Sequence, residues 1–165
     1  MSVETLKRIM TFVLLCMAQA LVFNNINLFH CATPMVYVYF TLMLPRRTPR
    51  WAALLWSFAV GLCIDMFSNT PGVAAASMTL IGMIQPPLLE MFLPRNADDN
   101  IRSSAEALTW IKFASLAVII VTIYCLVFFT IEFFTFVDFT GWLSCFVGST
   151  MLTLMFIFAF ECFRK

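Results

Sequence analysis

Six apolar runs make up most of the chain, and short stretches of polar residues and proline separate them. The runs cover residues 9–29, 34–44, 49–67, 71–93, 109–131 and 140–162. A helix needs about 20 mostly apolar residues to cross the hydrocarbon layer of a membrane, so nearly the whole chain is used in crossings. The pattern predicts an all-α integral membrane protein, a bundle of about six transmembrane helices.

The second run is too short for a crossing. Residues 34–44, followed by a proline, would form a helix of roughly 16 Å. We therefore expect a short or broken second helix, with irregular backbone over residues 24–29 completing the crossing. Such backbone is tolerated at membrane depth only where protein or water satisfies its polar groups. This stretch also supplies a candidate polar pocket, made of Asn24, Asn25 and Asn27.

Proline marks the expected helix boundaries. Thr-Pro pairs predict three helix starts, because the hydroxyl can cap a free amide and proline needs no amide partner at the first helical position. The pairs are Thr33-Pro34, Thr48-Pro49 and Thr70-Pro71. Pro86 and Pro87 interrupt the fourth run. Residues 88–93 beyond them either lie along the membrane surface or continue a kinked helix.

The basic residues give the expected orientation in the membrane. All ten flank alternate ends of the apolar runs, and they are Lys7, Arg8, Arg46, Arg47, Arg50, Arg95, Arg102, Lys112, Arg164 and Lys165. Because cytoplasmic loops carry an excess of Lys and Arg, this pattern predicts six crossings with both termini in the cytoplasm. Residues 94–108 are then a cytoplasmic loop, and residues 1–165 form a single membrane domain.

The composition agrees with a membrane protein and gives no sign of catalysis. Hydrophobic residues make up 62% of the chain and charged residues 12%, whereas soluble proteins have about 25% charged residues. The sequence shows no nucleophile and base pair, phosphate-binding loop or metal-ligand spacing, and its six cysteines, expected to be buried thiols, form no C-x-x-C pair. We therefore expect no enzyme, catalytic residue, metal site or cofactor, and no nucleic-acid partner.

Asp65 is the one acidic residue well inside an apolar run. Such a group normally faces the bundle interior or water and has a partner. In the structural hypothesis, its carboxylate staples the turn to the next helix through Asn69 and through free amides, expected to be those of Thr70, Gly72 and Val73. The functional hypotheses are a proton or ion site, or contact with a partner helix. Four other acids are expected near run ends, where water reaches them: Glu90, Glu132, Asp138 and Glu161.

Small residues surround this turn on both sides. They are Gly61, Ala74, Ala75, Ala76, Ser77 and Gly82. Small side chains let transmembrane helices approach closely. We therefore expect the third and fourth helices to pack tightly.

The same region carries a resemblance to a known family. Asp65-x-Phe67-Ser68-x-Thr70-Pro71-Gly72, preceded by Leu44-Pro45 and Thr48-Pro49-Arg50-Trp51, resembles the pattern of the rod shape-determining protein MreD family. The sharp part of the likeness lies within residues 33–94, whereas residues 100–165 match only as two apolar helices. The candidate functional positions are therefore Asp65, Phe67, Ser68, Asn69, Thr70, Pro71 and Gly72.

The resemblance implies a multi-pass protein of the bacterial inner (cytoplasmic) membrane. It would belong to the elongation complex, or elongasome, that directs cell shape and lateral peptidoglycan synthesis, and it would have no activity of its own. Such proteins pair with MreC, a single-span protein, and work near the MreB filament and the wall synthases. The turn from Asp65 to Gly72 would then be either a structural keystone or part of the contact with an MreC-like partner.

Two other classes of function stay open at this point. The family is similar to the small substrate-binding membrane subunits of energy-coupling-factor transporters, which implies a small ligand near the three asparagines and Asp65, and separate ATPases as partners. The second class is a small proton-coupled carrier, and Asp65 is the one residue that supports this hypothesis. Likeness of fold does not by itself establish function.

Overall fold

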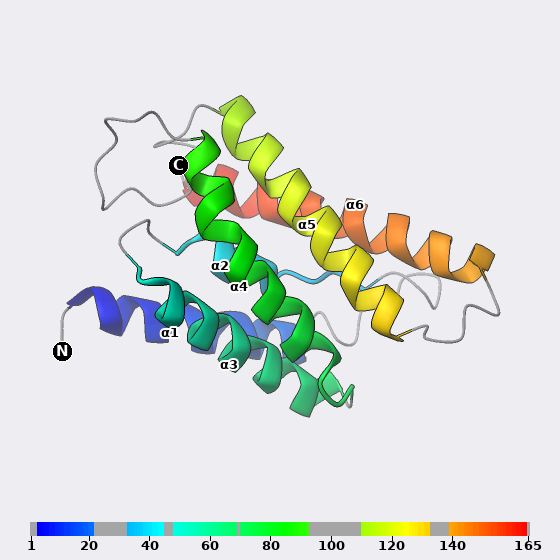
Figure 1. Cartoon of the computed structure of the whole chain (residues 1–165), viewed down its shortest axis with the longest axis horizontal. Helices are drawn as coiled ribbons and strands as arrows, with labels where there is room; N and C mark the ends of the chain where they lie inside the picture. The colour runs from blue at the N-terminus through cyan, green and yellow to red at the C-terminus, as the bar shows by residue number, and fades with distance from the viewer. Residues whose placement is uncertain are drawn as a thin grey trace.

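The computed structural model describes residues 3–21, 33–44, 48–68, 70–92, 110–132 and 139–164. All regular elements in these ranges are helices (Figure 1), namely α1 (Val3–Leu21), α2 (Val38–Leu42), α3 (Arg50–Ser68), α4 (Val73–Phe92), α5 (Trp110–Glu132) and α6 (Phe139–Arg164). The predicted loop 94–108 and the predicted polar pocket of Asn24, Asn25 and Asn27 lie outside the described residues.

The helices form an all-α membrane bundle, as the apolar runs predict. Four of them are long and apolar enough to cross a membrane: α3, α4, α5 and the Thr140–Phe163 part of α6. The apolar stretch of α1 is shorter, at Ile9–Gln19. Large apolar side chains point outward, including Met10 on α1, Met66 on α3 and Met155 on α6. Outward apolar groups suit a protein surrounded by lipid, where the bilayer is the solvent for the surface.

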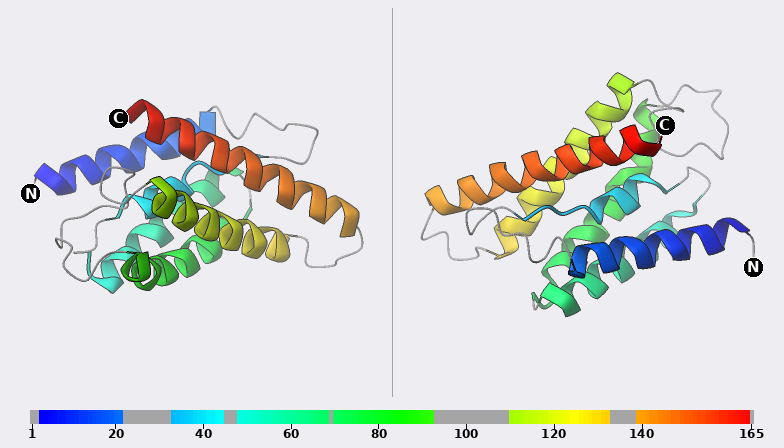
Figure 2. Two further views of the ribbon diagram at one scale, coloured as in Figure 1. Left: turned by 90° about the horizontal axis from the view of Figure 1, so that it is seen from above. Right: turned by 180° about the vertical axis from the view of Figure 1, so that it is seen from behind.

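The bundle has two layers (Figures 1 and 2). In one, α4 lies between α3 and α5; in the other, residues 33–44 pass between α1 and α6. We call residues 33–44 the central segment. The starts of α1, α3 and α5 and the ends of α4 and α6 lie toward the same end of the bundle. This arrangement fits the alternating basic residues, and the side of the membrane on which that end lies stays a prediction.

The central segment contains the broken second helix. Only Val38–Leu42 is helical, and the backbone before Val38 is irregular. The expectation of a helix beginning at Pro34 is therefore wrong, whereas the expectation of a short helix is confirmed. Pro34 to Leu44 is buried throughout, apart from the half-buried Met43. Proline lacks an amide hydrogen and restricts the residue before it to extended conformations, which keeps Thr33 out of a helix.

The Thr-Pro pairs do not cap helices in the expected way. The buried Thr48 hydroxyl has no hydrogen-bond partner within the described ranges, and α3 begins two residues later at Arg50. The Thr70 hydroxyl donates to Asp65 instead of accepting from an amide. Pro49 and Pro71 still lie within two residues of the starts of α3 and α4, where the fixed φ of proline suits the entry to a helix, whereas Pro34 does not.

Pro86 and Pro87 lie inside α4, which continues without interruption to Phe92. Of the two expectations for residues beyond them, continuation of the helix is therefore the correct one. Proline removes the amide that would bond to the carbonyl four residues earlier. Beside this site the Gln85 side chain reaches from α4 to the carbonyl of Leu44, at 3.5 Å.

The α3–α4 pair has the most extensive packing in the bundle. A Cβ added to Gly61 would lie 2.5 Å from the Cα of Ala75, and one added to Gly82 would lie 2.5 Å from the Ser57 hydroxyl. These distances are too short for a side chain, so the two glycines set how closely the helices approach. The prediction of tight packing between small residues is confirmed.

Candidate functional site: the Asp65 turn between α3 and α4

Asp65 lies near the end of α3, and its side chain is only 7% exposed. One carboxylate oxygen accepts hydrogen bonds from the amide of Ala74, at 2.9 Å, and from the Thr70 hydroxyl, at 3.0 Å. The other oxygen accepts from the amide of Ala75, at 2.8 Å. Three donors thus surround a carboxylate that would otherwise be costly to hold in a membrane segment.

The carboxylate acts as the cap of α4. The amides of Ala74 and Ala75 are the second and third of this helix, the pair that an N-cap side chain normally satisfies. The residue before the helix is Gly72, which has no side chain and has φ +85°, a region that favours glycine. Asp65 therefore supplies from α3 the acceptor that the N-cap position lacks, and its negative charge faces the positive end of the helix dipole.

This geometry refines the structural hypothesis for Asp65. The carboxylate does join α3 to the following helix, but its amide partners are Ala74 and Ala75. The expected partners Thr70, Gly72 and Val73 were assigned on the assumption that the helix opens immediately after proline. Because α4 begins at Val73, its second and third amides come later in the chain. Asn69, the other expected partner, lies outside the described residues.

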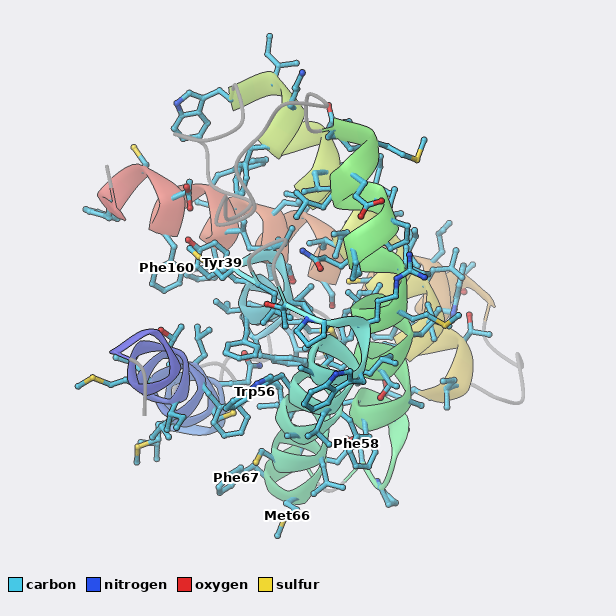
Figure 3. The ribbon with its side chains drawn as sticks, turned by 60° about the vertical axis from the view of Figure 1, so that its left-hand side comes forward. Tyr39, Trp56, Phe58, Met66, Phe67 and Phe160 are labelled. Atoms are coloured by element: carbon cyan, nitrogen blue, oxygen red, sulfur yellow. The ribbon has the colours of Figure 1, made fainter. Side chains whose placement is uncertain are left out.

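The other residues of the predicted 65–72 site differ in their surroundings: some lie near Asp65, and others lie on the outer surface. Thr70 faces Asp65, and Ser68 is half-buried at the end of α3. Phe67 is 61% exposed and, with the neighbouring Met66, points away from the bundle (Figure 3). Pro71 and Gly72 are exposed in the turn itself. The structure therefore brings Asp65 and Thr70 together and leaves Phe67 on the outer surface.

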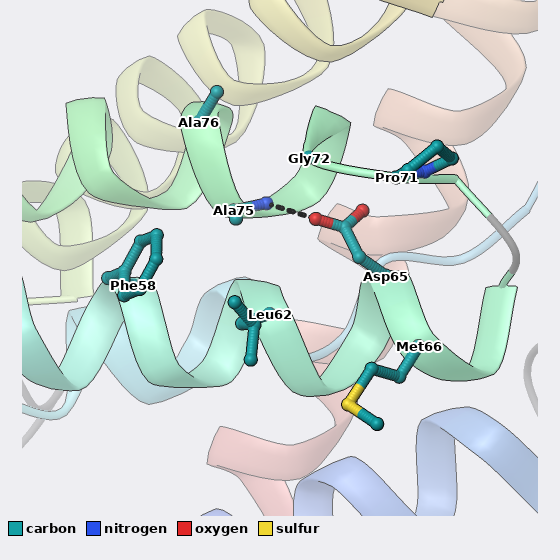
Figure 4. Close-up of a pocket in the computed structure, with 8 residues that line it drawn as sticks. All are labelled: Phe58, Leu62, Asp65, Met66, Pro71, Gly72, Ala75 and Ala76. Atoms are coloured by element: carbon teal, nitrogen blue, oxygen red, sulfur yellow. Dashed lines mark hydrogen bonds between the residues drawn. The ribbon is translucent and has the colours of Figure 1, made fainter.

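A groove of about 510 Å³ opens beside the capped turn (Figure 4). We call it the α3–α4 groove. Its α3 wall consists of Phe58, Leu62, Asp65 and Met66, and its other wall consists of Pro71, Gly72, Ala75 and Ala76. The Asp65 carboxylate is turned toward the α4 amides, so the surface that the groove offers is almost wholly apolar. Bulky groups line one wall and small groups the other, a shape that suits a ridge of side chains from another helix.

A second polar cluster, which the sequence analysis missed, holds the central segment in place. The Gln19 side chain of α1 accepts from the amide of Val36, at 3.2 Å, and donates to the carbonyl of Pro34, at 2.9 Å. From α6, the Thr153 hydroxyl accepts from the amide of Met35 at 2.9 Å, and the Ser149 hydroxyl accepts from the amide of Thr33 at 3.2 Å. Protein groups thus satisfy the irregular backbone, as its depth in the bundle requires.

Glu161 differs from its predicted environment. The expectation that water reaches it is wrong, because its side chain is only 3% exposed. The Tyr39 hydroxyl donates to Glu161 Oε2 at 2.6 Å, and the Tyr39 ring stacks on Phe160 (Figure 3). Tyr39 belongs to α2, and its side chain contacts α6 through both Glu161 and Phe160. Deeper in the bundle, the hydroxyls of Tyr37 and Tyr124 are hydrogen-bonded to each other.

The described side chains form a packed interior made largely of apolar and aromatic groups. No group of three or more His, Cys, Asp or Glu side chains suited to a metal ion occurs in the part of the chain that the structure describes. The largest buried groups include Tyr37, Tyr124 and Phe113, each no more than 2% exposed. The arrangement around Asp65 suits a rigid joint with an apolar outer surface.

Comparison with known proteins adds no relative: no family model, curated protein or solved structure matches the chain.

Proposed function

We propose that the chain is a non-enzymatic scaffold of the bacterial cell-shape complex in the inner membrane. In this role it binds an MreC-like single-span protein and supports lateral peptidoglycan synthesis near the MreB filament and the wall synthases. The proposal begins from the resemblance in residues 65–72 to the MreD pattern. The observation that carries it is the Asp65 cap, which turns these residues into a rigid joint beside an apolar groove.

The joint is suited to holding a partner because several separate contacts fix its geometry. Asp65 locks the start of α4, and Gly61 allows the two helices to touch at backbone distance. A surface that is rigid before binding loses little conformational entropy when a partner docks. A scaffold needs this property, whereas a carrier needs a site that alternates between two sides.

The α3–α4 groove gives the proposed partner a place to sit. A single transmembrane helix packs in lipid through van der Waals contact and close approach at small residues. The groove offers Ala75 and Ala76 on one side and the outward Leu62 and Met66 on the other. We therefore assign the contact of an MreC-like helix to this surface.

A site-specific crosslinking experiment tests the assignment. A photoreactive phenylalanine analogue at Leu62 or Met66 should crosslink, in native membranes, to a single-span protein with a large domain outside the cytoplasm. The same analogue at Met155 of α6 is the matched control, because Met155 is 71% exposed and lies outside the groove. Equal crosslinking from all three positions, or none from the first two, would overturn this contact.

Purification of the tagged protein in mild detergent, followed by mass spectrometry, tests the wider role. Recovery of an MreC-like protein together with wall synthases supports the scaffold. Recovery of paired ATPases with a coupling subunit contradicts it and identifies a substrate-binding subunit of a transporter. The crosslinking result and the purification result are independent, so a failed groove assignment is distinguishable from a wrong function.

A further inference from the structure

Glu90 is an exposed acid near the end of α4, at the opposite end of this helix from the Asp65 turn. The starts of α3 and α5, which carry Arg50 and Lys112, lie toward the same end of the bundle (Figures 1 and 2). Neither of these basic side chains, nor any other described one, forms an ion pair with Glu90. Within the described residues its negative charge is therefore uncompensated, and a docking partner can complement it.

The spacing of exposed residues places Glu90 on the same face of α4 as the α3–α4 groove. Ala76 lines the groove, Met83 and Glu90 follow it at intervals of seven residues, and all three are exposed. Seven residues are about two turns of an α-helix, so these positions share one face. On α3, the exposed Leu55 lies seven residues before Leu62 of the groove. Because α3 and α4 pack side by side in opposite directions, these five residues form one outer surface, which we call the α3–α4 face.

A second hydrogen-bond acceptor lies beside Glu90 on this face. Pro87 has no amide hydrogen, so the helix supplies no donor four residues after Met83 for the carbonyl of that residue. Side chains of a helix lean toward the preceding turn, which brings the Glu90 carboxylate over Pro87. Two acceptors, one of them charged, thus lie on the same side of α4. A guanidinium, with its five N–H donors, is suited to both, and an ammonium is suited to the carboxylate.

We propose that a single transmembrane helix with an arginine or lysine at one end occupies the α3–α4 face, with its basic residue paired to Glu90. The inference rests on the proposed scaffold function and adds to it the orientation of the partner helix. The charged end lies beside the start of α3, and the apolar part fills the groove beside the Asp65 turn. In the predicted topology the charged end is cytoplasmic, where basic flanks of transmembrane helices are expected.

The length of the face favours a helix as its occupant. From Ala76 to Glu90, α4 rises by about 21 Å, which is roughly two thirds of the hydrocarbon thickness of a bilayer. An apolar surface of this length that ends in an acid matches the pattern of a membrane-spanning segment with a basic flank. The apolar contacts supply packing, and the charge pair fixes which end of the partner lies at Glu90.

Mapping of crosslinks in native membranes tests the orientation with the full chain. A photoreactive phenylalanine analogue at Leu62 should capture the partner in the half of its helix that lies far from the basic flank. The same analogue at Met83 should capture the same protein nearer that flank. Mass spectrometry of the two crosslinked peptides gives the order of the contacts along the partner. The reverse order, or a partner helix without a basic residue at the Met83 end, would overturn the inference.

Charge exchange tests the pairing itself. Glu90→Arg should lower the yield of the Leu62 crosslink by at least about fivefold, and Glu90→Gln should lower it less. Glu132→Arg is the matched control, because it reverses the charge of another exposed acid at the end of α5, at the opposite end of the bundle. The control should keep the wild-type yield. Replacing the mapped basic residue of the partner with glutamate should restore the yield in Glu90→Arg.

The outcomes separate this inference from the proposed function. If Leu62 captures the partner equally well in wild type, Glu90→Arg and the control, the scaffold contact stands, whereas the pairing is wrong and Glu90 faces only water and lipid headgroups. If Leu62 captures no partner in the wild type, the proposed contact fails and the orientation falls with it. Size-exclusion chromatography confirms that each variant is folded, and Glu90→Gln carries the test if Glu90→Arg is not.

Discussion

The amide of Ala75 donates to the carboxylate of Asp65 at 2.8 Å, so the side chain that caps α4 belongs to α3. A cap from a neighbouring helix does two things that a local cap does not. It satisfies the free amides of the helix start, and it fixes the angle and separation of two helices. The Asp65 carboxylate therefore adds to the α3–α4 joint a constraint that is separate from the close packing at Gly61 and Gly82.

Replacing Asp65 with Ala should destabilise the protein by about 1–3 kcal/mol, because two buried amides and a hydroxyl lose a charged acceptor. Asp65→Asn keeps one acceptor oxygen and should cost less. Thermal unfolding in detergent, followed by the loss of the folded peak in size-exclusion chromatography, measures both. Glu90→Gln, at the exposed far end of α4, is the control and should change little. An Asp65→Ala protein as stable as the control would contradict the cap.

The same variants separate a scaffold from a carrier. A carrier that uses Asp65 as its proton site should lose coupled uptake entirely in Asp65→Asn. In a scaffold, Asp65→Asn should retain partner binding in proportion to the folded fraction. Co-purification of the partner at a temperature where the variant stays folded gives the comparison.

Gly82→Ala should destabilise the α3–α4 contact by about 1–3 kcal/mol through overpacking, because its new Cβ would lie 2.5 Å from the Ser57 hydroxyl and 2.8 Å from the Ser57 Cβ. Adding Ser57→Gly removes both obstructing atoms and should restore part of the lost stability. Gly61→Ala meets the backbone of Ala74 and Ala75, so Ser57→Gly should not rescue it. Unfolding midpoints of the single and double variants test this, and equal rescue of both would contradict the packing.

Thr153→Val should destabilise the bundle by about 1–3 kcal/mol, because the buried amide of Met35 loses its acceptor and a valine of the same shape offers none. Thr130→Val is matched in chemistry, but the Thr130 hydroxyl bonds only to Leu126 of its own helix at an exposed position. That control should stay within about 0.5 kcal/mol of the wild type. Hydrogen exchange of the Met35 amide should rise in the first variant alone.

Tyr39→Phe removes the hydroxyl that donates to Glu161 and keeps the ring that stacks on Phe160. Hydrogen bonds to charged groups contribute about 1.5–3 kcal/mol. A double-mutant cycle with Glu161→Gln, read from unfolding midpoints, isolates this pair from the other contacts of each residue. Strict additivity of the two substitutions would show that the pair contributes nothing.

The sequence was sufficient for the membrane fold and for singling out Asp65. Long apolar runs have few alternatives to helices in lipid, and an acid within one stands out because burying it is costly. Its amide partners were misassigned because they depend on whether α4 begins at Pro71 or at Val73, and propensity alone locates a helix start only within a few residues.

The contacts of the central segment could not be derived in the same way. Gln19 is one polar residue within an apolar run, and Thr153 bonds to an amide 118 positions away. The sequence held only an indirect sign of these contacts. The run 34–44 is too short to cross the membrane as a helix, so its irregular backbone needs hydrogen-bond partners from other parts of the chain. The exposure of Glu161 was predicted wrongly for a related reason. Its position near the end of an apolar run does not show that Tyr39, from another helix, covers it.

The central segment also constrains how the protein is made. The amides of Thr33 and Met35 receive their acceptors from residues 116 and 118 positions later. Ribosomes add about 5–20 residues per second, so these amides leave the ribosome on the order of ten seconds before α6 exists. During that interval water or the insertion machinery must occupy them, since bare amides are not tolerated in lipid. Insertion of the last helix is therefore the event that closes the interior of the bundle.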